Sequence, residues 1–189
     1  ENHDLGRCIN RFGSLEYRVE SAKAIATMNF LLKGTPYIYQ GQEIGMTNIV
    51  MTDVNEYDDV EVHGFYKEYV LEKKFLTYEQ FLEACNKEAR DNNRTPIQWD
   101  DSVNAGFNTG AKPWLKINPN YKEINVKASL SDPNSVLNYY KKLLALRKSE
   151  KNDGPQVTEE ELESIIETME DEGVIENEDA EMMQNVLDI

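Results

Sequence analysis

The stretch that decides the predicted fold runs from residue 34 to residue 46 and reads Gly34-Thr35-Pro36-Tyr37-Ile38-Tyr39-Gln40-Gly41-Gln42-Glu43-Ile44-Gly45-Met46. Residues 35–40 are typical of a short buried strand, and Pro36 stands near its start, where no backbone donor is needed. Residues 41–46 leave this strand through a turn flanked by glycines. The segment therefore predicts a strand that ends in a glycine-bounded turn.

A helix is predicted immediately before this strand, over residues 14–33. Its apolar residues recur every three or four positions and so share one face; they are Leu15, Val19, Ala22, Ile25, Ala26, Met28 and Leu32. Ser14 is a candidate N-cap, and Gly34 is placed to end the helix in a left-handed conformation. If residues 1–4 end a preceding strand, the chain forms a βα unit of a parallel sheet.

Further helices are predicted downstream. Residues 47–60 form a polar loop, and residues 60–73 are weakly helical. Thr77 with Gln80 is a capping-box pattern that opens another helix. A last helix is predicted from Ser131-Asp132-Pro133 to about Lys148, with the proline in its first turn. Between these helices, residues 90–121 show little periodicity, and irregular segments of that length are usually functional.

Charge divides the chain into two parts, residues 1–150 and 151–189. The second part holds one lysine and fourteen acidic residues, a net charge of −13, which leaves −2 of the total of −15 for the first part. All eighteen aromatic residues lie in the first part. This break predicts two segments of different origin, the second an acidic helical hairpin that begins at a Thr158–Glu161 capping box. The acidic balance argues against nucleic acid or an anionic membrane surface as a partner.

The cysteines and the apolar runs place the chain in a broad class. Cys8 and Cys85 are far apart, which predicts reduced thiols of a cytoplasmic protein and no disulfide framework. No apolar run approaches the roughly 18–20 residues that span a bilayer. The two histidines, His3 and His63, have no zinc-like spacing, and there is no glycine-rich phosphate loop, so we expect no metal and no cofactor.

Three places could carry chemistry. His3 and Asp4 stand side by side, and Arg7 follows closely enough to hold Asp4 ionised; the alternative is a set of polar surface and salt-bridge residues. Glu43 follows the predicted strand and turn, where it serves either the site or the structure around it. Arg90-Asp91-Asn92-Asn93-Arg94, with Trp99 close behind, offers planar polar groups and an aromatic face, as carbohydrate sites do. A charge-laced loop is the alternative there.

Together these motifs resemble glycoside hydrolase family 13, the α-amylase family, and within it the oligo-1,6-glucosidase, dextran glucosidase and trehalose-6-phosphate hydrolase group. The resemblance covers about residues 1–148. Asn2-His3-Asp4 is similar to the family motif at the end of the seventh barrel strand, and residues 34–46 to the motif of the eighth. Residues 90–99, with Ala105-Gly106-Phe107, resemble the loop subdomain that follows it.

The resemblance implies a fold and roles. It implies an α/β fold, the C-terminal portion of a (β/α)8 TIM barrel, whose site lies at the C-terminal ends of the strands, and a retaining mechanism on α-glucosides of short oligosaccharides. Asp4 would stabilise the transition state. His3 and Arg7 would bind the same sugar, Arg90 and Arg94 would lie near the leaving group, and Glu43 would be structural near the site. Leu5-Gly6 departs from the Gln-Pro of many relatives.

The resemblance also implies missing partners. The nucleophilic Asp and the acid/base Glu of the family lie on earlier strands, so we expect a fragment that lacks the N-terminal barrel portion and is inactive alone. Residues 157–189 resemble the acidic helical segment of CorC/HlyC-type CBS proteins. Two other hypotheses are a non-catalytic carbohydrate-binding or interaction module, and a regulatory linker that acts through this tail.

Overall fold

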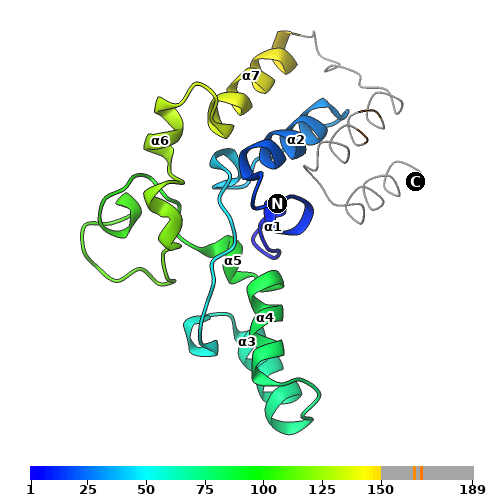
Figure 1. Ribbon diagram of the computed structural model, residues 1–189, viewed down its shortest axis with the longest axis vertical. Helices are drawn as coiled ribbons and strands as arrows, with labels where there is room; N and C mark the ends of the chain where they lie inside the picture. The colour runs from blue at the N-terminus through cyan, green and yellow to red at the C-terminus, as the bar shows by residue number, and fades with distance from the viewer. Residues whose placement is uncertain (150–163, 165–166, 168–189) are drawn as a thin grey trace.

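The computed structural model describes residues 1–149, Ser164 and Glu167, and in this part it is built from helices joined by long irregular segments (Figure 1). In chain order these are α1 Cys8–Phe12, α2 Arg18–Leu31, η1 Gln42–Ile44, η2 Val54–Glu56, α3 Val60–Phe65, η3 Tyr66–Glu72, α4 Tyr78–Glu88, α5 Asp91–Arg94, η4 Val103–Gly106, η5 Pro119–Lys122, α6 Val126–Ser131 and α7 Val136–Ser149. The predicted tail hairpin lies outside the described residues. No helix in the described part is long and apolar enough to cross a membrane.

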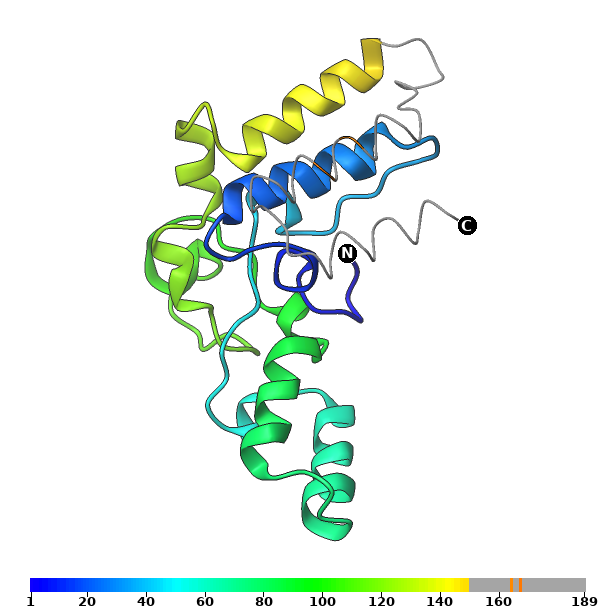
Figure 2. The ribbon, with the colours of Figure 1, turned by 45° about the vertical axis from the view of Figure 1, so that its right-hand side comes forward.

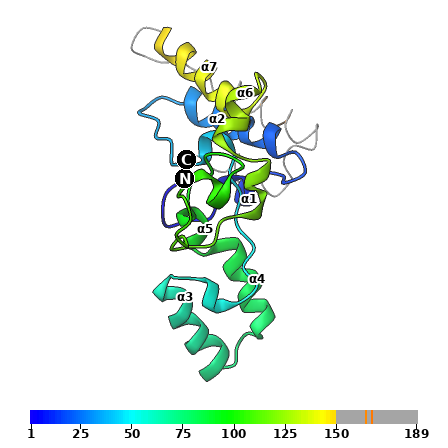
Figure 3. The same cartoon turned by 90° about the vertical axis from the view of Figure 1, so that its left-hand side faces the viewer.

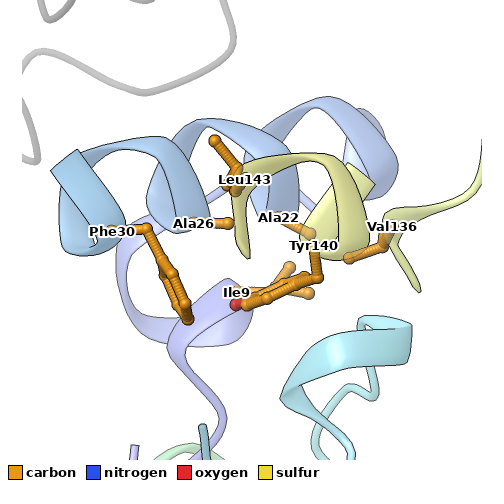
Figure 4. Close-up of a cluster of buried hydrophobic side chains, with 7 residues drawn as sticks. All are labelled: Ile9, Ala22, Ala26, Phe30, Val136, Tyr140 and Leu143. Atoms are coloured by element: carbon orange, nitrogen blue, oxygen red, sulfur yellow. The ribbon is translucent and has the colours of Figure 1, made fainter. Parts of the chain in front are cut away.

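Helices α2 and α7 pack side by side and run in the same direction (Figures 1 and 2). Their contact is apolar, and α1 closes it from below (Figure 4); the buried residues are Ile9, Ala22, Ala26, Phe30, Val136, Tyr140 and Leu143. The Phe30 and Tyr140 rings meet edge to face, with centroids 5.3 Å apart. Such burial is the main force that holds a helix pair together.

Arg147 fastens the end of this pair. Its guanidinium donates from Nη1 to the carbonyl oxygens of Phe30 at 2.6 Å and Leu32 at 3.0 Å, and from Nη2 to that of Gly34. The last carbonyls of a helix have no partner within it, and a cation there also suits the negative end of the helix dipole. One residue of α7 thus caps α2.

A second unit, formed by α3, η3 and α4, projects from the other end of the molecule (Figures 1 and 3). The core between these helices and the preceding loop consists of Ile49, Met51, Val54, Tyr57, Val62, Phe81 and Cys85. The predicted capping box is confirmed, because the Gln80 N–H donates to Thr77 Oγ1 and the Thr77 N–H donates to Gln80 Oε1. The weak helix at 60–73 is also confirmed, as α3 followed by the π-helical turn η3.

The predicted buried strand at residues 35–40 is wrong for this structure. No residue from 1 to 149 belongs to a strand, and Tyr37 is 85% exposed. A strand needs a neighbouring backbone to satisfy its N–H and C=O groups. Here the Tyr39 N–H donates to the Gln42 side chain, and the Gln40 carbonyl accepts from Arg7. The turn after it is as predicted, with Gly41 and Gly45 at φ of 88° and 67° around η1.

Two helix starts also differ from the prediction. Helix α2 begins at Arg18, because the Ser14 hydroxyl accepts the Tyr17 N–H and closes a turn ahead of the helix. Helix α7 begins at Val136, where the Ser135 hydroxyl accepts the Asn138 N–H and acts as the cap. The short helices α1 and α6 were not predicted, and neither has enough residues for a clear apolar period.

Candidate active site

The side chains of His3 and Asp4 lie together on the surface at the start of the chain. His3 Nε2 is 3.2 Å from Asp4 Oδ2, and these side chains are 67% and 51% exposed. The Asp4 N–H donates to Asn2 Oδ1 at 2.8 Å, a local bond that turns the chain so that both side chains face outward. The pair is therefore open to a ligand.

Arg94 holds this loop in place from α5. Its Nε donates to the His3 carbonyl oxygen at 2.8 Å, and its Nη2 donates to Asp4 Oδ1 at 3.1 Å. Asn93 supports the same loop, because its side-chain amide donates to the carbonyls of Asn2 at 2.9 Å and Gly6 at 3.2 Å. The asparagine and arginine of the loop subdomain thus position the His3–Asp4 pair across ninety residues of sequence.

Arg90 approaches the same Asp4 oxygen, Oδ1, and binds more acids than Arg94. Its Nε and Nη2 both bind the Asp59 carboxylate, whose side chain is 3% exposed. Its Nη1 is 3.3 Å from Glu61 Oε1 and 3.9 Å from Asp4 Oδ1. The hydrogen bonds from Arg90 hold the pKa of Asp59 below its usual value, so Asp59 stays ionised and cannot serve as a proton donor.

Asp91 fixes the loop that carries Asp59. Asp91 is 1% exposed, and its Oδ2 accepts the N–H groups of Asp58 at 2.7 Å and Asp59 at 3.0 Å. Burial raises the pKa of Asp91 above its usual value, although these two bonds oppose the shift. Neighbouring residues of one motif therefore act in different ways, since Arg90 pairs with Asp59 while Asp91 supports its backbone.

Arg7 and Glu43 lie away from this group. The Arg7 side chain is buried, with Nη1 3.2 Å from Glu1 Oε2 and 2.7 Å from the Gln40 carbonyl oxygen. Glu1 in turn accepts the Cys8 N–H. Glu43 is in η1, and its Oε2 is buried without a hydrogen-bond partner in the described part of the chain. Neither residue contacts His3 or Asp4 in the described part of the chain.

The structure therefore brings together four of the six predicted site residues, His3, Asp4, Arg90 and Arg94. Sequence reasoning missed Asp59 and Glu61, and it included Asp91 in the 90–94 motif without giving it a role. Asp59 carried one usable signal, because an Asp immediately before a helical run is a common N-cap, and its side chain does accept the Glu61 N–H. That signal predicts the cap but not the pairing with Arg90. In the described part, no cluster of three or more Asp, Glu, His or Cys residues could hold a metal ion.

An exposed carboxylate between two arginines, beside an imidazole, defines a site that can hold sugar hydroxyls or stabilise a developing positive charge. The family comparison agrees with this class. The model of the α-amylase catalytic domain matches residues 1–153, and the chain belongs to the α-amylase family.

Several curated relatives are similar to the chain over most of its length. It is 55% identical over 148 residues to the oligo-1,6-glucosidase of Parageobacillus thermoglucosidasius, a match that covers 78% of this chain and 26% of that enzyme. It is 49% identical to the α-glucosidase of Pediococcus pentosaceus, with 77% and 26% covered. The chain thus spans about a quarter of the length of the curated relatives it matches.

Solved structures give the same result. The chain aligns with a variant of isomaltulose synthase from Erwinia rhapontici NX5 in complex with sucrose at a TM-score of 0.75 and 49% identity, covering 79% of this chain and 27% of that one. A trehalulose synthase variant aligns at 0.77 and 46%, covering 82% and 28%. These neighbours are TIM-barrel enzymes of the same family, which is consistent with part of such a barrel in this chain.

Proposed function

We propose that this chain contributes one side of the active site of an α-glucosidase that hydrolyses short α-glucosides. Asp4 accepts hydrogen bonds from the hydroxyls of the glucosyl unit and stabilises the positive charge that develops at its anomeric carbon. His3 binds the same sugar. The observation that carries the proposal is the exposed His3–Asp4 pair, held from beneath by Arg94.

Arg90 and Arg94 have different parts in this proposal. Arg94 bonds to both His3 and Asp4, so it orients the pair. Arg90 keeps Nη1 on the Asp4 side of the site, where it faces the leaving group. Arg7 is buried and acts as a positioning residue, because it ties Glu1 to the Gln40 carbonyl. Glu43 is assigned a structural role near the site.

The chain alone is proposed to be inactive. A retaining glycosidase needs two carboxyl groups about 5–5.5 Å apart across the scissile bond, one of them protonated. Near Asp4, Asp59 is buried and ionised, and Glu61 is paired with the same Arg90. The nucleophile and the acid/base would come from the remaining length of a whole enzyme, consistent with the share of the relatives that this chain covers.

The decisive experiment is a chimera of the Parageobacillus thermoglucosidasius oligo-1,6-glucosidase. In it, the matching segment of that enzyme is replaced by residues 1–148 of this chain. We expect the chimera to hydrolyse isomaltose, and Asp4→Asn to lower its kcat by about 10²-fold or more, as loss of an electrostatic stabiliser does. Asp101→Asn, which changes an exposed carboxylate paired with Lys127, is the matched control and should keep full activity. Equal activity of the Asp4 and Asp101 variants would exclude the role given to Asp4.

The isolated chain tests the second half of the proposal. We expect no release of nitrophenol from a nitrophenyl α-glucoside by the purified 189-residue chain. Turnover that Asp4→Asn abolishes would show that the chain holds a complete catalytic set. Saturable binding of isomaltose by the isolated chain, together with an Asp4→Asn chimera that retains full activity, would instead support the non-catalytic carbohydrate-binding module.

A further inference from the structure

An apolar cleft lies beside Asp4, between α3 with η3 on one side and α4 on the other. Its volume is about 320 Å³, which is large enough to hold a small organic molecule. The walls are mostly apolar, and their large apolar side chains are Val62, Phe65, Tyr69, Leu76 and Phe81. Phe65 and Leu76 are 47% and 38% exposed, so part of this apolar surface faces solvent. A ligand that covers these side chains would gain binding free energy, because their apolar surface would be removed from water.

The rim of the cleft is acidic. Four carboxylates line it, those of Asp4, Asp59, Glu61 and Glu88, together with a single arginine, Arg90. Two guanidinium groups compensate part of this charge. Arg90 binds Asp59 through two bonds and also lies 3.3 Å from Glu61, and Arg94 binds Asp4. Two of the four negative charges at the rim therefore remain in excess.

These two properties together select a class of ligand. A sugar has no apolar face large enough to cover these walls, and an anion is repelled by the rim. A neutral apolar molecule gains from the walls but nothing from the carboxylates. We propose that the cleft binds an amphipathic cation, an aryl- or alkylamine whose apolar body lies against Phe65 and Leu76 and whose ammonium lies at the rim with Glu61 and Glu88.

Binding in this cleft does not depend on the proposed glucosidase role, but it has a consequence for it. Asp4 lines the cleft as well as belonging to the His3–Asp4 pair. A ligand in the cleft would occupy space beside Asp4, where the sugar is proposed to bind. The amine should therefore compete with a glucoside for the site in any enzyme that contains this segment.

The binding test uses the full chain and three matched probes followed by NMR titration: phenethylamine, phenethyl alcohol and ethylamine. We expect the amine to bind about fivefold more tightly than the alcohol, the gain of one partly exposed ion pair. Ethylamine should bind more weakly still, because it lacks the ring. In about 1 M NaCl, where the Debye length is about 3 Å, the advantage of the amine over the alcohol should largely disappear.

Variants locate the site. Glu61→Gln and Glu88→Gln should each weaken phenethylamine without changing phenethyl alcohol, and Phe65→Ser should weaken both. Glu83→Gln is the matched control for Glu88→Gln. Glu83 is an exposed carboxylate on the same helix, α4, and it does not line the cleft. Glu88→Gln changes an exposed charge at the end of α4, and Glu61→Gln also removes the contact with Arg90. Glu88→Gln therefore keeps the test independent of whether the serine variant folds.

Three results would overturn the proposal. The first is equal affinity for the amine and the alcohol at low salt, which would make the rim irrelevant. The second is equal affinity for phenethylamine and ethylamine, which would mean that only charge is sensed. The third is a Glu83→Gln effect as large as that of Glu61→Gln, which would place the binding on the general acidic surface. None of these results bears on the Asp4 chimera, so the two proposals fail separately.

Discussion

Arg90 and Asp59 form a two-bond ion pair that joins the candidate site to the α3–α4 unit. Arg90 Nε lies 2.7 Å from Asp59 Oδ2, and Arg90 Nη2 binds Oδ1, while Nη1 stays near Asp4. Bidentate arginine–carboxylate pairs fix direction as well as distance. The orientation of Arg90 Nη1, which faces Glu61 and Asp4, therefore depends on a buried acid outside the motifs that predict the site.

The first prediction concerns acid stability. The Arg90 hydrogen bonds lower the pKa of Asp59 in the folded chain, so this pair adds stability at pH values above the ordinary pKa. The added stability is lost as the pH falls through the lowered value. Asp59→Asn should therefore reduce the urea midpoint at neutral pH, and the difference from the wild type should shrink below about pH 4. Asp58→Asn, at the exposed neighbouring residue, is the control, and an equal effect there would contradict the role of the pair.

Asp91 gives a second prediction. Its contribution to stability changes with pH in the opposite direction to that of Asp59. Burial raises its folded pKa, so its contribution to stability falls as the pH rises from the ordinary value through the raised one. Asp91→Asn keeps an oxygen for the N–H groups of Asp58 and Asp59 and removes the buried charge. Asp91→Ala leaves both groups without their acceptor and should cost about 1–3 kcal/mol. We expect the Asn variant to unfold at a clearly higher urea concentration than the Ala variant at neutral pH, and equal midpoints would refute this account.

Gly41 gives a third prediction, from backbone geometry. Its φ is 88°, and an added Cβ would lie 2.4 Å from Met46 Sδ and 3.0 Å from Arg7 Nη1. Gly41→Ala should therefore cost about 1–3 kcal/mol in unfolding free energy, since strain and a clash act together. At Gly64, inside α3, an added Cβ would meet no atom within 4 Å, and Gly64→Ala should stabilise by about 0.5–1 kcal/mol. Thermal unfolding of both variants checks the opposite signs.

The exposed segment at residues 34–40 gives a fourth prediction. Tyr37 is 85% exposed and Ile38 40%, and Leu32 nearby is 42% exposed. Apolar residues grouped on a surface favour association, and an extended backbone beside them can pair with another chain. The double variant Tyr37→Ser with Ile38→Ser should lower the weight-average molar mass of the isolated chain, measured by analytical ultracentrifugation. Its helical circular dichroism should not change. Val50→Ser, a single exposed apolar residue elsewhere, should leave that mass unchanged.

Local features of the fold were predictable from the sequence. Thr77 and Gln80 form the predicted capping box because both partners lie within one helical turn. The predicted glycine-flanked turn is present at Gly41 and Gly45, since such a turn requires only local geometry. The prediction that Gly34 ends the preceding helix was wrong, because α2 ends at Leu31 and Leu32 is its C-cap. The apolar period predicted for 14–33 marked the middle of the buried face of α2 correctly, because Ala22, Ile25 and Ala26 are all buried. It was wrong at both ends, where Leu15 and Leu32 are exposed.

The sequence by itself also determined the family, through several ordered motifs, and with it the candidate residues His3, Asp4, Arg90 and Arg94. Only the tertiary structure decided how they meet. Arg94 reaches Asp4 across ninety positions, Arg90 is held by Asp59, and Arg7 is turned inward to Glu1. Residues 35–40 have strand-like composition but no strand, because backbone pairing needs a neighbour that composition does not specify. Motifs record which residues are present, whereas pairing and burial depend on contacts between distant parts of the chain.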